Sequence, residues 1–252
     1  FGLFYQPVSS QIIVNEYSAS NLSTVTDNYS KYEDWIELHN TGAGSVDIGG
    51  YYLSDKILNP LKWQFPAGVS IPAGGFLVVW ASGRDEVSGG HYHSNFKLQQ
   101  TKDVQEHVVL SDAGGVLIEQ HELQITRRGH SNGRAPDASE NWSVFGTETP
   151  GATNNTSNVY QRYCEMPTMS VEAGFYTDTV TVEITTTEPN SEIHYTTNGT
   201  EPSGSSPLYT GPITITETTV LIARTYSLDN TILKSRVVFN TYFIDVTHTM
   251  AV

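Results

Sequence analysis

Short runs in which apolar and polar residues alternate, separated by turn-forming residues, dominate this chain. The run TVTVEITTT at 179–187 places its valines and isoleucine on one face and its threonines on the other. The run SEIHY at 191–195 alternates isoleucine and tyrosine with glutamate and histidine in the same way. A period of two is typical of half-buried antiparallel strands. No segment shows a sustained apolar period of 3.6 residues, so the pattern predicts an all-β protein with few helices.

From Gln11 to about Asn154, candidate strands alternate with clusters of glycine and proline, such as those at 72–75 and 114–115. Strands separated by turn clusters at this spacing predict a β-sandwich or a barrel. The candidate strands are IIVNEY (12–17), DWIELHN (34–40), GGYYLSD (49–55), WQF (63–65), FLVVWAS (76–82), EHVVLSD (106–112) and GVLIEQHEL (115–123).

A polar, aperiodic stretch that ends in proline, TNNTSNVYQRYCEMP, divides the chain and reads as a linker. The N-terminal residues form a short apolar run followed by small residues, which is typical of a signal-peptide remnant; the alternative is an ordered mature start at Phe1. The predicted organisation is an N-terminal segment at 1–10, a first domain at 11–154, a linker at 155–166, a second domain at 167–245 and the start of a downstream region at 246–252.

The motifs of the first domain resemble the lamin tail domain in its bacterial form. They recur in the order of that family over most of the domain, and the resemblance implies an Ig-like β-sandwich without a catalytic centre. The motifs are DWIELHN (34–40), GGYYLSD (49–55), FPAGVSIPAGGFLVVW (65–80) and NWSVFGTETPGATN (141–154).

The motifs of the second domain resemble the chitobiase/beta-hexosaminidase C-terminal domain, a second Ig-like sandwich. Asn198-Gly199 is the favoured dipeptide for a tight hairpin turn. The two resemblances imply two Ig-like β-sandwich domains in tandem, an order found upstream of spore-coat-kinase-like (CotH) domains in secreted bacterial proteins. The motifs are SEIHYTTNGTEP (191–202), SPLYTGPI (206–213), TTVLIARTY (218–226) and Ser235.

Composition excludes several classes of protein. The net charge of −14 over 252 residues repels phosphate backbones, so we expect no nucleic-acid partner. No run approaches the roughly 20 apolar residues that span a bilayer, so we expect no membrane span. Cys164 is the one cysteine, which rules out an internal disulfide, and we read it as an incidental linker thiol, with intermolecular pairing as the alternative.

Acidic residues gather around the first two candidate strands. Calcium binding is one interpretation of Glu16, Asp27, Glu33, Asp34 and Glu37, but no Asp-x-Asp-x-Asp run with a glycine is present. The favoured interpretation is structural. Glu37 shares a strand face with Trp35, and we expect its carboxylate to accept backbone N–H bonds from an adjoining loop.

Histidines and aromatic residues offer two further hypotheses. His91 and His93 could form a metal site with His107, His121 or His130, but their glycine-flanked position favours solvated loop histidines. No phosphate-binding glycine loop and no Gly-x-Ser-x-Gly elbow occurs. All four tryptophans lie in the first domain; an exposed aromatic platform would favour sugar binding, whereas buried tryptophans would count against it.

Together these features predict exported, non-catalytic modules that serve as adhesion, docking or spacer units of a larger bacterial surface or secreted protein. The alternative is a carbohydrate-binding accessory module of a polysaccharide-acting enzyme. We assign no catalytic residue, metal or cofactor, and we expect any enzymatic activity downstream of Val252. The candidate binding residues are Asp34, Trp35 and Glu37, and the expected partner is a protein or a glycan at the cell surface. Nothing in the sequence specifies the oligomeric state.

Overall fold

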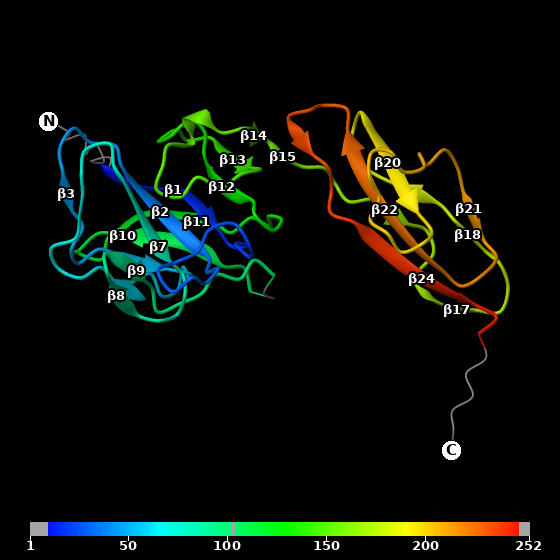
Figure 1. Cartoon of the computed structure of the whole chain (residues 1–252), viewed down its shortest axis with the longest axis horizontal. Helices are drawn as coiled ribbons and strands as arrows, with labels where there is room; N and C mark the ends of the chain where they lie inside the picture. The colour runs from blue at the N-terminus through cyan, green and yellow to red at the C-terminus, as the bar shows by residue number, and fades with distance from the viewer. Residues whose placement is uncertain (1–9, 102–103, 247–252) are drawn as a thin grey trace, which may run out of the picture. The chain divides into compact units, whose positions relative to one another are not determined.

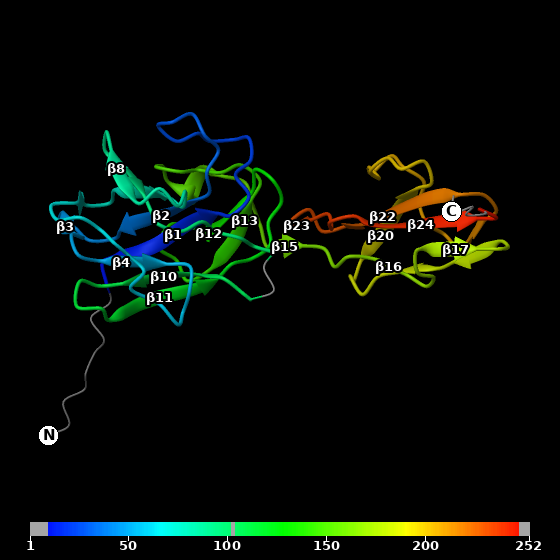
Figure 2. The ribbon, with the colours of Figure 1, turned by 90° about the horizontal axis from the view of Figure 1, so that it is seen from below.

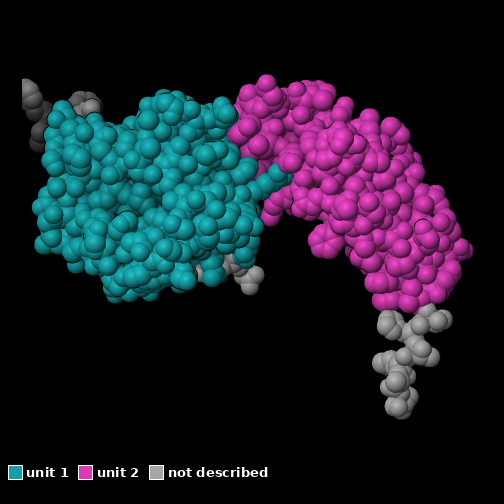
Figure 3. Space-filling view, viewed as in Figure 1, with its two compact units in different colours: residues 1–159 teal, residues 160–252 magenta. Residues whose placement is uncertain are grey.

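The computed structural model describes residues 10–101 and 104–246 (Figure 1). The predicted signal-peptide remnant and the predicted downstream start lie, apart from Ser10 and Val246, outside the described residues. The chain divides into two compact units, Phe1–Val159 and Tyr160–Val252 (Figure 3), and each is described by itself.

The first unit is built around an eight-stranded sheet. From β13 to β8 its strand pairs are antiparallel except for β7 and β9, which run parallel. In order across the sheet, the strands are β14 (Val159–Tyr160), β13 (Trp142–Phe145), β12 (Ser131–Arg134), β1 (Ile12–Ser18), β2 (Trp35–Asn40), β7 (Phe76–Trp80), β9 (His91–His93) and β8 (Glu86–Ser88).

A four-stranded sheet forms the second layer of the first unit, and Figure 2 shows its β4, β10 and β11 beside β1 and β2. Ile36 and Leu38 from the first sheet pack with Leu53 and Leu110 from the second in one fully buried core. In order, the second sheet holds β11 (Leu117–Glu122), β10 (His107–Ser111), β4 (Tyr52–Ser54) and β5 (Trp63–Gln64), and a separate pair is formed by β3 (Val46–Asp47) and β6 (Ser70–Ile71).

The second unit is also built from β-sheets. Val182, Ile184, Leu221 and Tyr242 form its core, as the alternation at 179–187 predicts. Its main sheet holds β17 (Gly174–Tyr176), β24 (Val238–Ile244), β22 (Thr219–Ser227) and β20 (Ser191–Thr196). Three two-stranded pairs complete it: β15 (Arg162–Tyr163) with β23 (Ile232–Leu233), β16 (Thr168–Met169) with β19 (Ile184–Thr185), and β18 (Val180–Val182) with β21 (Ile213–Ile215).

The all-β prediction is confirmed, because the one helical element among the described residues is the short 3-10 helix η1 (Asn154–Thr156). Gly199 adopts a φ of +78°, which a glycine accepts without strain. Residues 155–166, which the sequence predicts to be a linker, contain strands β14 and β15. Cys164 directly follows β15, where it is buried and donates its backbone N–H to the carbonyl oxygen of Leu233. Within the described ranges, no helix has the length and apolar character needed to cross a membrane.

Candidate functional site

Strand β2 buries both of its faces. All six residues from Trp35 to Asn40 are buried. Ile36 and Leu38 belong to the apolar core, so alternation turns Trp35 and Glu37 to the opposite face of the sheet. Residues 146–154, which follow β13, are hydrogen-bonded to this second face and are called the closing segment.

A β-bulge in β1 brings a second carboxylate beside Glu37. Val14 pairs with Leu38, but the next paired residue is Glu16, which lies opposite Glu37. Asn15 is therefore an extra residue in β1, and two side chains of this strand face one position of β2. Sequence alternation alone did not reveal this arrangement.

Glu37 accepts hydrogen bonds from the neighbouring strand β1 and from the closing segment. Its Oε1 accepts from Asn15 Nδ2 at 3.1 Å, and its Oε2 accepts from the backbone N–H of Gly151 at 2.6 Å. The predicted backbone bond from an adjoining loop is confirmed. Burial raises the pKa of Glu37 to about 8, although the bond from Asn15 lowers it, and the nearby charge of Glu16 raises it further.

Glu16 binds the closing segment more extensively. Its Oε1 accepts from Ser131 Oγ at 2.5 Å and from the backbone N–H of Thr149 at 3.2 Å. Its Oε2 lies 2.6 Å from Thr149 Oγ1. Burial raises the pKa of Glu16 to about 7, against the lowering effect of the bonds from Ser131 and Thr149.

Glu148, on the closing segment itself, is the third acid on this face. Its Oε1 accepts from Ser18 Oγ at 2.7 Å, and its Oε2 accepts from the hydroxyl of Thr24. Within the described ranges, Glu16, Glu37 and Glu148 form no ion pair; we call these three residues the carboxylate layer. The sequence did not single out Glu148, which lies 130 residues from Ser18.

The other two candidate binding residues lie at the start of β2. Asp34 is half-buried and accepts from the backbone N–H of Asn21 at 3.1 Å; burial raises its pKa to about 7. Trp35 is fully buried, and its indole N–H has no hydrogen-bond partner. Because Trp35 and Glu37 are both buried, neither contacts solvent or an external ligand in this conformation.

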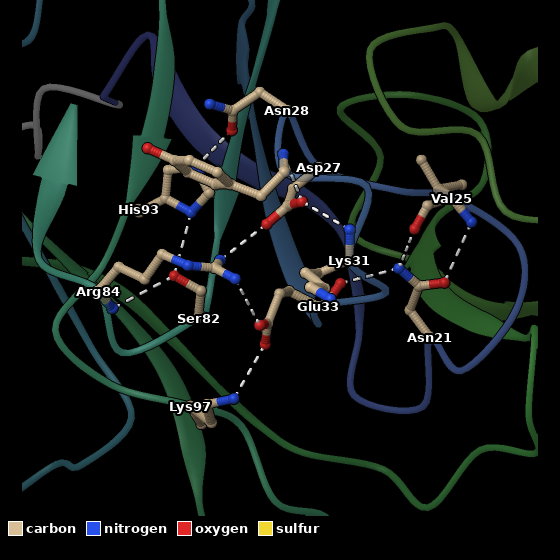
Figure 4. A network of polar contacts seen from close by, with 11 residues as sticks. Asn21, Val25, Asp27, Asn28, Lys31, Glu33, Ser82, Arg84, His93 and Lys97 are labelled. Atoms are coloured by element: carbon tan, nitrogen blue, oxygen red, sulfur yellow. Dashed lines mark hydrogen bonds and ion pairs between the residues drawn. The ribbon is translucent and has the colours of Figure 1, made fainter. Parts of the chain in front are cut away.

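A separate polar cluster fixes the loop that precedes β2 (Figure 4). Asp27 accepts from the backbone N–H groups of Tyr29 and Lys31, both at 2.8 Å, through Oδ1. Its Oδ2 accepts from Arg84 at 2.7 Å. The side chain of Asp27 is fully buried, so the guanidinium compensates a charge that water does not reach.

Arg84 also pairs with a second acid of the same loop. Its Nη2 lies 3.2 Å from Glu33, whose other oxygen accepts from Lys97 at 3.0 Å. We call Asp27, Glu33, Arg84 and Lys97 the loop anchor. Unlike the carboxylate layer, it supplies two cations for two acids.

His93 lies beside the loop anchor and is fully buried. Its Nδ1 is 3.0 Å from Ser82 Oγ, and its Nε2 is 2.7 Å from Asn28 Oδ1. Ser82 Oγ also accepts from the backbone N–H of Arg84 at 3.3 Å, so its hydroxyl hydrogen is free to donate to Nδ1. This pattern suits a neutral imidazole, and burial lowers the pKa of His93 in the same sense.

The prediction that the sequence His91–His93 lies in a solvated loop is wrong. These residues form β9, which pairs with β7 and β8; His93, at one end of the strand, is buried, whereas His91, at the other end, stays exposed. The Ser82, His93 and Asn28 contacts resemble a nucleophile–base–orienter series, yet Ser82 is 5% exposed and its oxygen is already bonded on both sides. We therefore assign this series a structural role.

The metal hypotheses find no support in the geometry. Among the described residues, no three histidine, cysteine, aspartate or glutamate side chains are grouped so that they could hold a metal ion. Four of the five early acids that suggested calcium are divided between the carboxylate layer and the loop anchor, and the fifth, Asp34, accepts from Asn21; their oxygens already accept bonds from protein donors.

The exposed aromatic residues are not those that the sequence singled out. Trp35, Trp63 and Trp80 are buried and Trp142 is half-buried. The second unit instead exposes Phe175 (58%) and Phe239 (66%). Phe175 stacks on Phe243 of the adjacent strand at 4.6 Å between ring centroids. The alternation of β24 could have revealed them, because Phe239, Thr241 and Phe243 lie on one face of the strand and Tyr242, on the other face, is buried in the core. We call Phe175, Phe239 and Phe243 the phenylalanine strip.

The two units match different families. Residues 6–124 match the Lamin Tail Domain family. Residues 171–238 match the family described as the Chitobiase/beta-hexosaminidase C-terminal domain. The chain therefore consists of two Ig-like β-sandwich domains in tandem, in the predicted order. The lamin tail match ends before the motif at 141–154, so the resemblance of that motif stays a prediction.

A similarity to a curated protein covers much of the chain. The protein named Endoglucanase from Clostridium saccharobutylicum is 29% identical over 157 residues. The match covers 61% of this chain and 32% of the relative, so it spans about a third of that protein's length.

Proposed function

We propose that this chain is a non-catalytic pair of modules that acts as a docking or spacer unit of a larger exported bacterial protein. The observation that carries the proposal is that the buried acids and His93 of the first unit bind other groups of the protein. The carboxylate layer holds the closing segment, and the loop anchor with His93 holds the loop before β2. Groups that bind one another so completely are not available to a substrate.

An assay for polysaccharide hydrolysis tests the absence of catalysis. We expect the purified chain to release no reducing ends from cellulose, chitin or mixed β-glucans above a heat-inactivated control. The series Ser82–His93–Asn28 is the arrangement that most resembles catalytic machinery. Turnover that Ser82→Ala abolishes, while Ser111→Ala at another buried serine retains it, would contradict the proposal.

A second candidate function is carbohydrate binding in support of a polysaccharide-acting enzyme. The similarity to a protein named Endoglucanase favours it, and so does the phenylalanine strip, because exposed aromatic rings can pack on the apolar faces of sugars. The burial of three tryptophans counts against a platform on the first unit.

Affinity electrophoresis through gels that contain a soluble β-glucan tests this second candidate. We expect retarded migration of the wild type and normal migration of the double variant Phe175→Ala, Phe239→Ala. Leu58→Ala is the matched control, because Leu58 is a fully exposed apolar residue of the first unit. Unretarded wild type, or equal retardation of all three proteins, would exclude the strip as a glycan platform.

The wider context of the chain also belongs to the proposal. An extracellular location agrees with the chitobiase-type match and with the endoglucanase relative, and fractionation of the source cells would test it. The proposed position upstream of a spore-coat-kinase-like domain predicts a kinase-like sequence after Val252 in the full-length protein. A full-length sequence without such a domain would remove that part of the proposal.

A further inference from the structure

In the carboxylate layer, Glu16, Thr149 and Asn154 form a hydrogen-bonded chain, and the chain is neutral or negative according to whether Glu16 is protonated. Thr149 Oγ1 lies 2.6 Å from Glu16 Oε2 and 2.7 Å from Asn154 Oδ1. Asn154 Nδ2 donates to the backbone oxygen of Arg134 at 3.0 Å, which fixes Oδ1 as an acceptor. Both neighbours of the Thr149 hydroxyl are therefore oxygen atoms that would accept its hydrogen.

A hydroxyl has one hydrogen and can donate to one of these two acceptors. If Glu16 is ionised, one of the two short oxygen–oxygen contacts contains no hydrogen and is repulsive. If Glu16 carries a proton on Oε2, it donates to Thr149 Oγ1, which in turn donates to Asn154 Oδ1. Both contacts are then hydrogen bonds, so the observed geometry suits the protonated acid.

The other oxygen of Glu16 agrees with this assignment. Ser131 Oγ and the backbone N–H of Thr149 both point to Oε1, which acts only as an acceptor. A protonated carboxylic acid has one oxygen that only accepts and one that carries the proton and can donate. In Glu16, Oε1 faces two donors and Oε2 faces the hydroxyl of Thr149, which matches these two roles. Glu37 provides a contrast, because donors of Asn15 and Gly151 occupy both of its oxygens.

The charged and titratable groups around Glu16 favour retention of its proton. Glu37 on β2, Glu148 on the closing segment and Asp137 in the loop after β12 are acidic. Arg134 of β12 is paired with Glu119 of the second sheet. Other titratable groups on these elements are Asp34 before β2, whose pKa burial and the charges of Glu33 and Glu148 raise, and His39 on β2, which contacts the backbone oxygen of Gly75. Arg127 and His130 precede β12, and burial and Arg127 lower the pKa of His130.

We propose that the proton shared by Glu16 and Thr149 closes residues 146–154 onto the sheet, and that its loss above neutral pH loosens this segment. The closing segment is the part of the structure that can move to admit water, because the other walls around Glu16 are strands of the sheet. Burial, which raises the pKa of Glu16 to about 7, places the change in an accessible pH range. Lifting the segment hydrates the new charge and relieves the contact between Thr149 and Asn154.

Hydrogen–deuterium exchange of the full chain at pH 5.5 and 8.5 tests the proposal. After correction for intrinsic exchange rates, we expect protection of the Thr149 and Gly151 amides to fall about tenfold or more at the higher pH. Amides of β10, in the core, serve as the internal reference and should change much less. Wild-type protection that does not respond to pH would overturn the proposal.

Glu16→Gln is the decisive variant. Its amide N–H₂ donates to Thr149 Oγ1 at every pH, and its oxygen accepts from Ser131 and the Thr149 backbone, so it imitates the protonated acid. We expect its segment to stay closed, with a protection change under about threefold between the two pH values. Glu140→Gln removes an exposed acid and should respond to pH as the wild type does.

Two further variants keep the test decisive if Glu16→Gln does not fold. Thr149→Val removes the hydroxyl and should give low, pH-independent protection of the segment. Glu37→Gln removes the other acid that contacts the segment and leaves the Glu16–Thr149 pair in place, so its segment should still lose protection at the higher pH. A pH response in Thr149→Val equal to that of the wild type would contradict the role of the shared proton.

Discussion

The first unit buries acids in two ways, and the difference decides how each cluster responds to pH. In the loop anchor, Arg84 and Lys97 face Asp27 and Glu33, so the charged forms compensate one another. In the carboxylate layer, Glu16, Glu37 and Glu148 have hydrogen-bond donors but no cation within the described ranges. A cation beside a buried acid stabilises its charged form, whereas burial without a cation raises the pKa, as it does for Glu16 and Glu37.

Among the substitutions, removal of the central cation should have the largest effect on this comparison. Arg84→Met leaves the buried Asp27 carboxylate with only its two backbone donors, and we expect a loss of about 3 kcal/mol in the free energy of unfolding. Urea unfolding followed by tryptophan fluorescence measures it, since all four tryptophans lie in the first unit. Lys97→Met, at a largely exposed partner, is the control and should cost under about 0.5 kcal/mol. Equal losses of unfolding free energy in Arg84→Met and Lys97→Met would show that compensation of the buried Asp27 charge does not stabilise the loop anchor.

The pH profile of stability should separate the two clusters. The raised pKa values, about 7 for Glu16 and about 8 for Glu37 against an ordinary 4.5, mean that the folded state holds more protons between these limits. The free energy of unfolding of the first unit should therefore fall as pH rises from 5 to 8, by roughly 6 kcal/mol for the two acids together.

His93 acts in the opposite direction at lower pH. Its pKa is lowered, so its contribution is present above the ordinary value of 6.5 and is lost as the pH falls through the lowered value. Urea titrations at pH 5, 6.5 and 8 measure the balance. A free energy of unfolding that rises between pH 6.5 and 8 would contradict the assignment of the carboxylate layer.

The second unit offers a paired acid that extends the comparison. Glu188 accepts two bonds from Arg162, at 2.7 and 2.8 Å, and a third from the backbone N–H of Glu165. The bond from Arg162 holds the pKa of Glu188 below its ordinary value, so its contribution should be lost as the pH falls through the acid range. We expect Glu188→Gln to destabilise the second unit by about 1–2 kcal/mol, with thermal unfolding followed by circular dichroism as the measurement. An unchanged midpoint would show that this ion pair is unimportant.

The smallest effect should come from the aromatic cover of the loop anchor. Arg84 lies over the ring of Tyr29 at 4.9 Å from the centroid, at a partly exposed position. Tyr29→Leu should cost about 0.5–1 kcal/mol in urea unfolding, because it removes the cation–π contact but keeps apolar cover. Tyr32→Leu, at a similarly exposed tyrosine of the same loop, is the control and should have less effect.

The sequence predicts the strands well because their alternation is local. Val182 and Ile184 are buried as expected, and Glu37 accepts the expected backbone bond. The histidine prediction failed because the glycine-flanked run forms a strand in the sheet, which buries His93. The bond between Glu16 and Thr149 could not be inferred, because 133 residues separate them and no local pattern links a strand to a segment so distant.

The extra residue in β1 has a consequence for the whole first unit. With strict alternation from Ile12, residues 14, 16 and 18 would share one side, and a glutamate and a serine would enter hydrocarbon while Tyr17 faced the polar side. The extra residue Asn15 shifts the alternation of the strand by one position. Ile12 and Val14 therefore face the core before it, and Tyr17 faces the core after it. One extra residue thus allows β1 to contribute apolar side chains to the core at both ends and to place the titratable acid Glu16 on the opposite face.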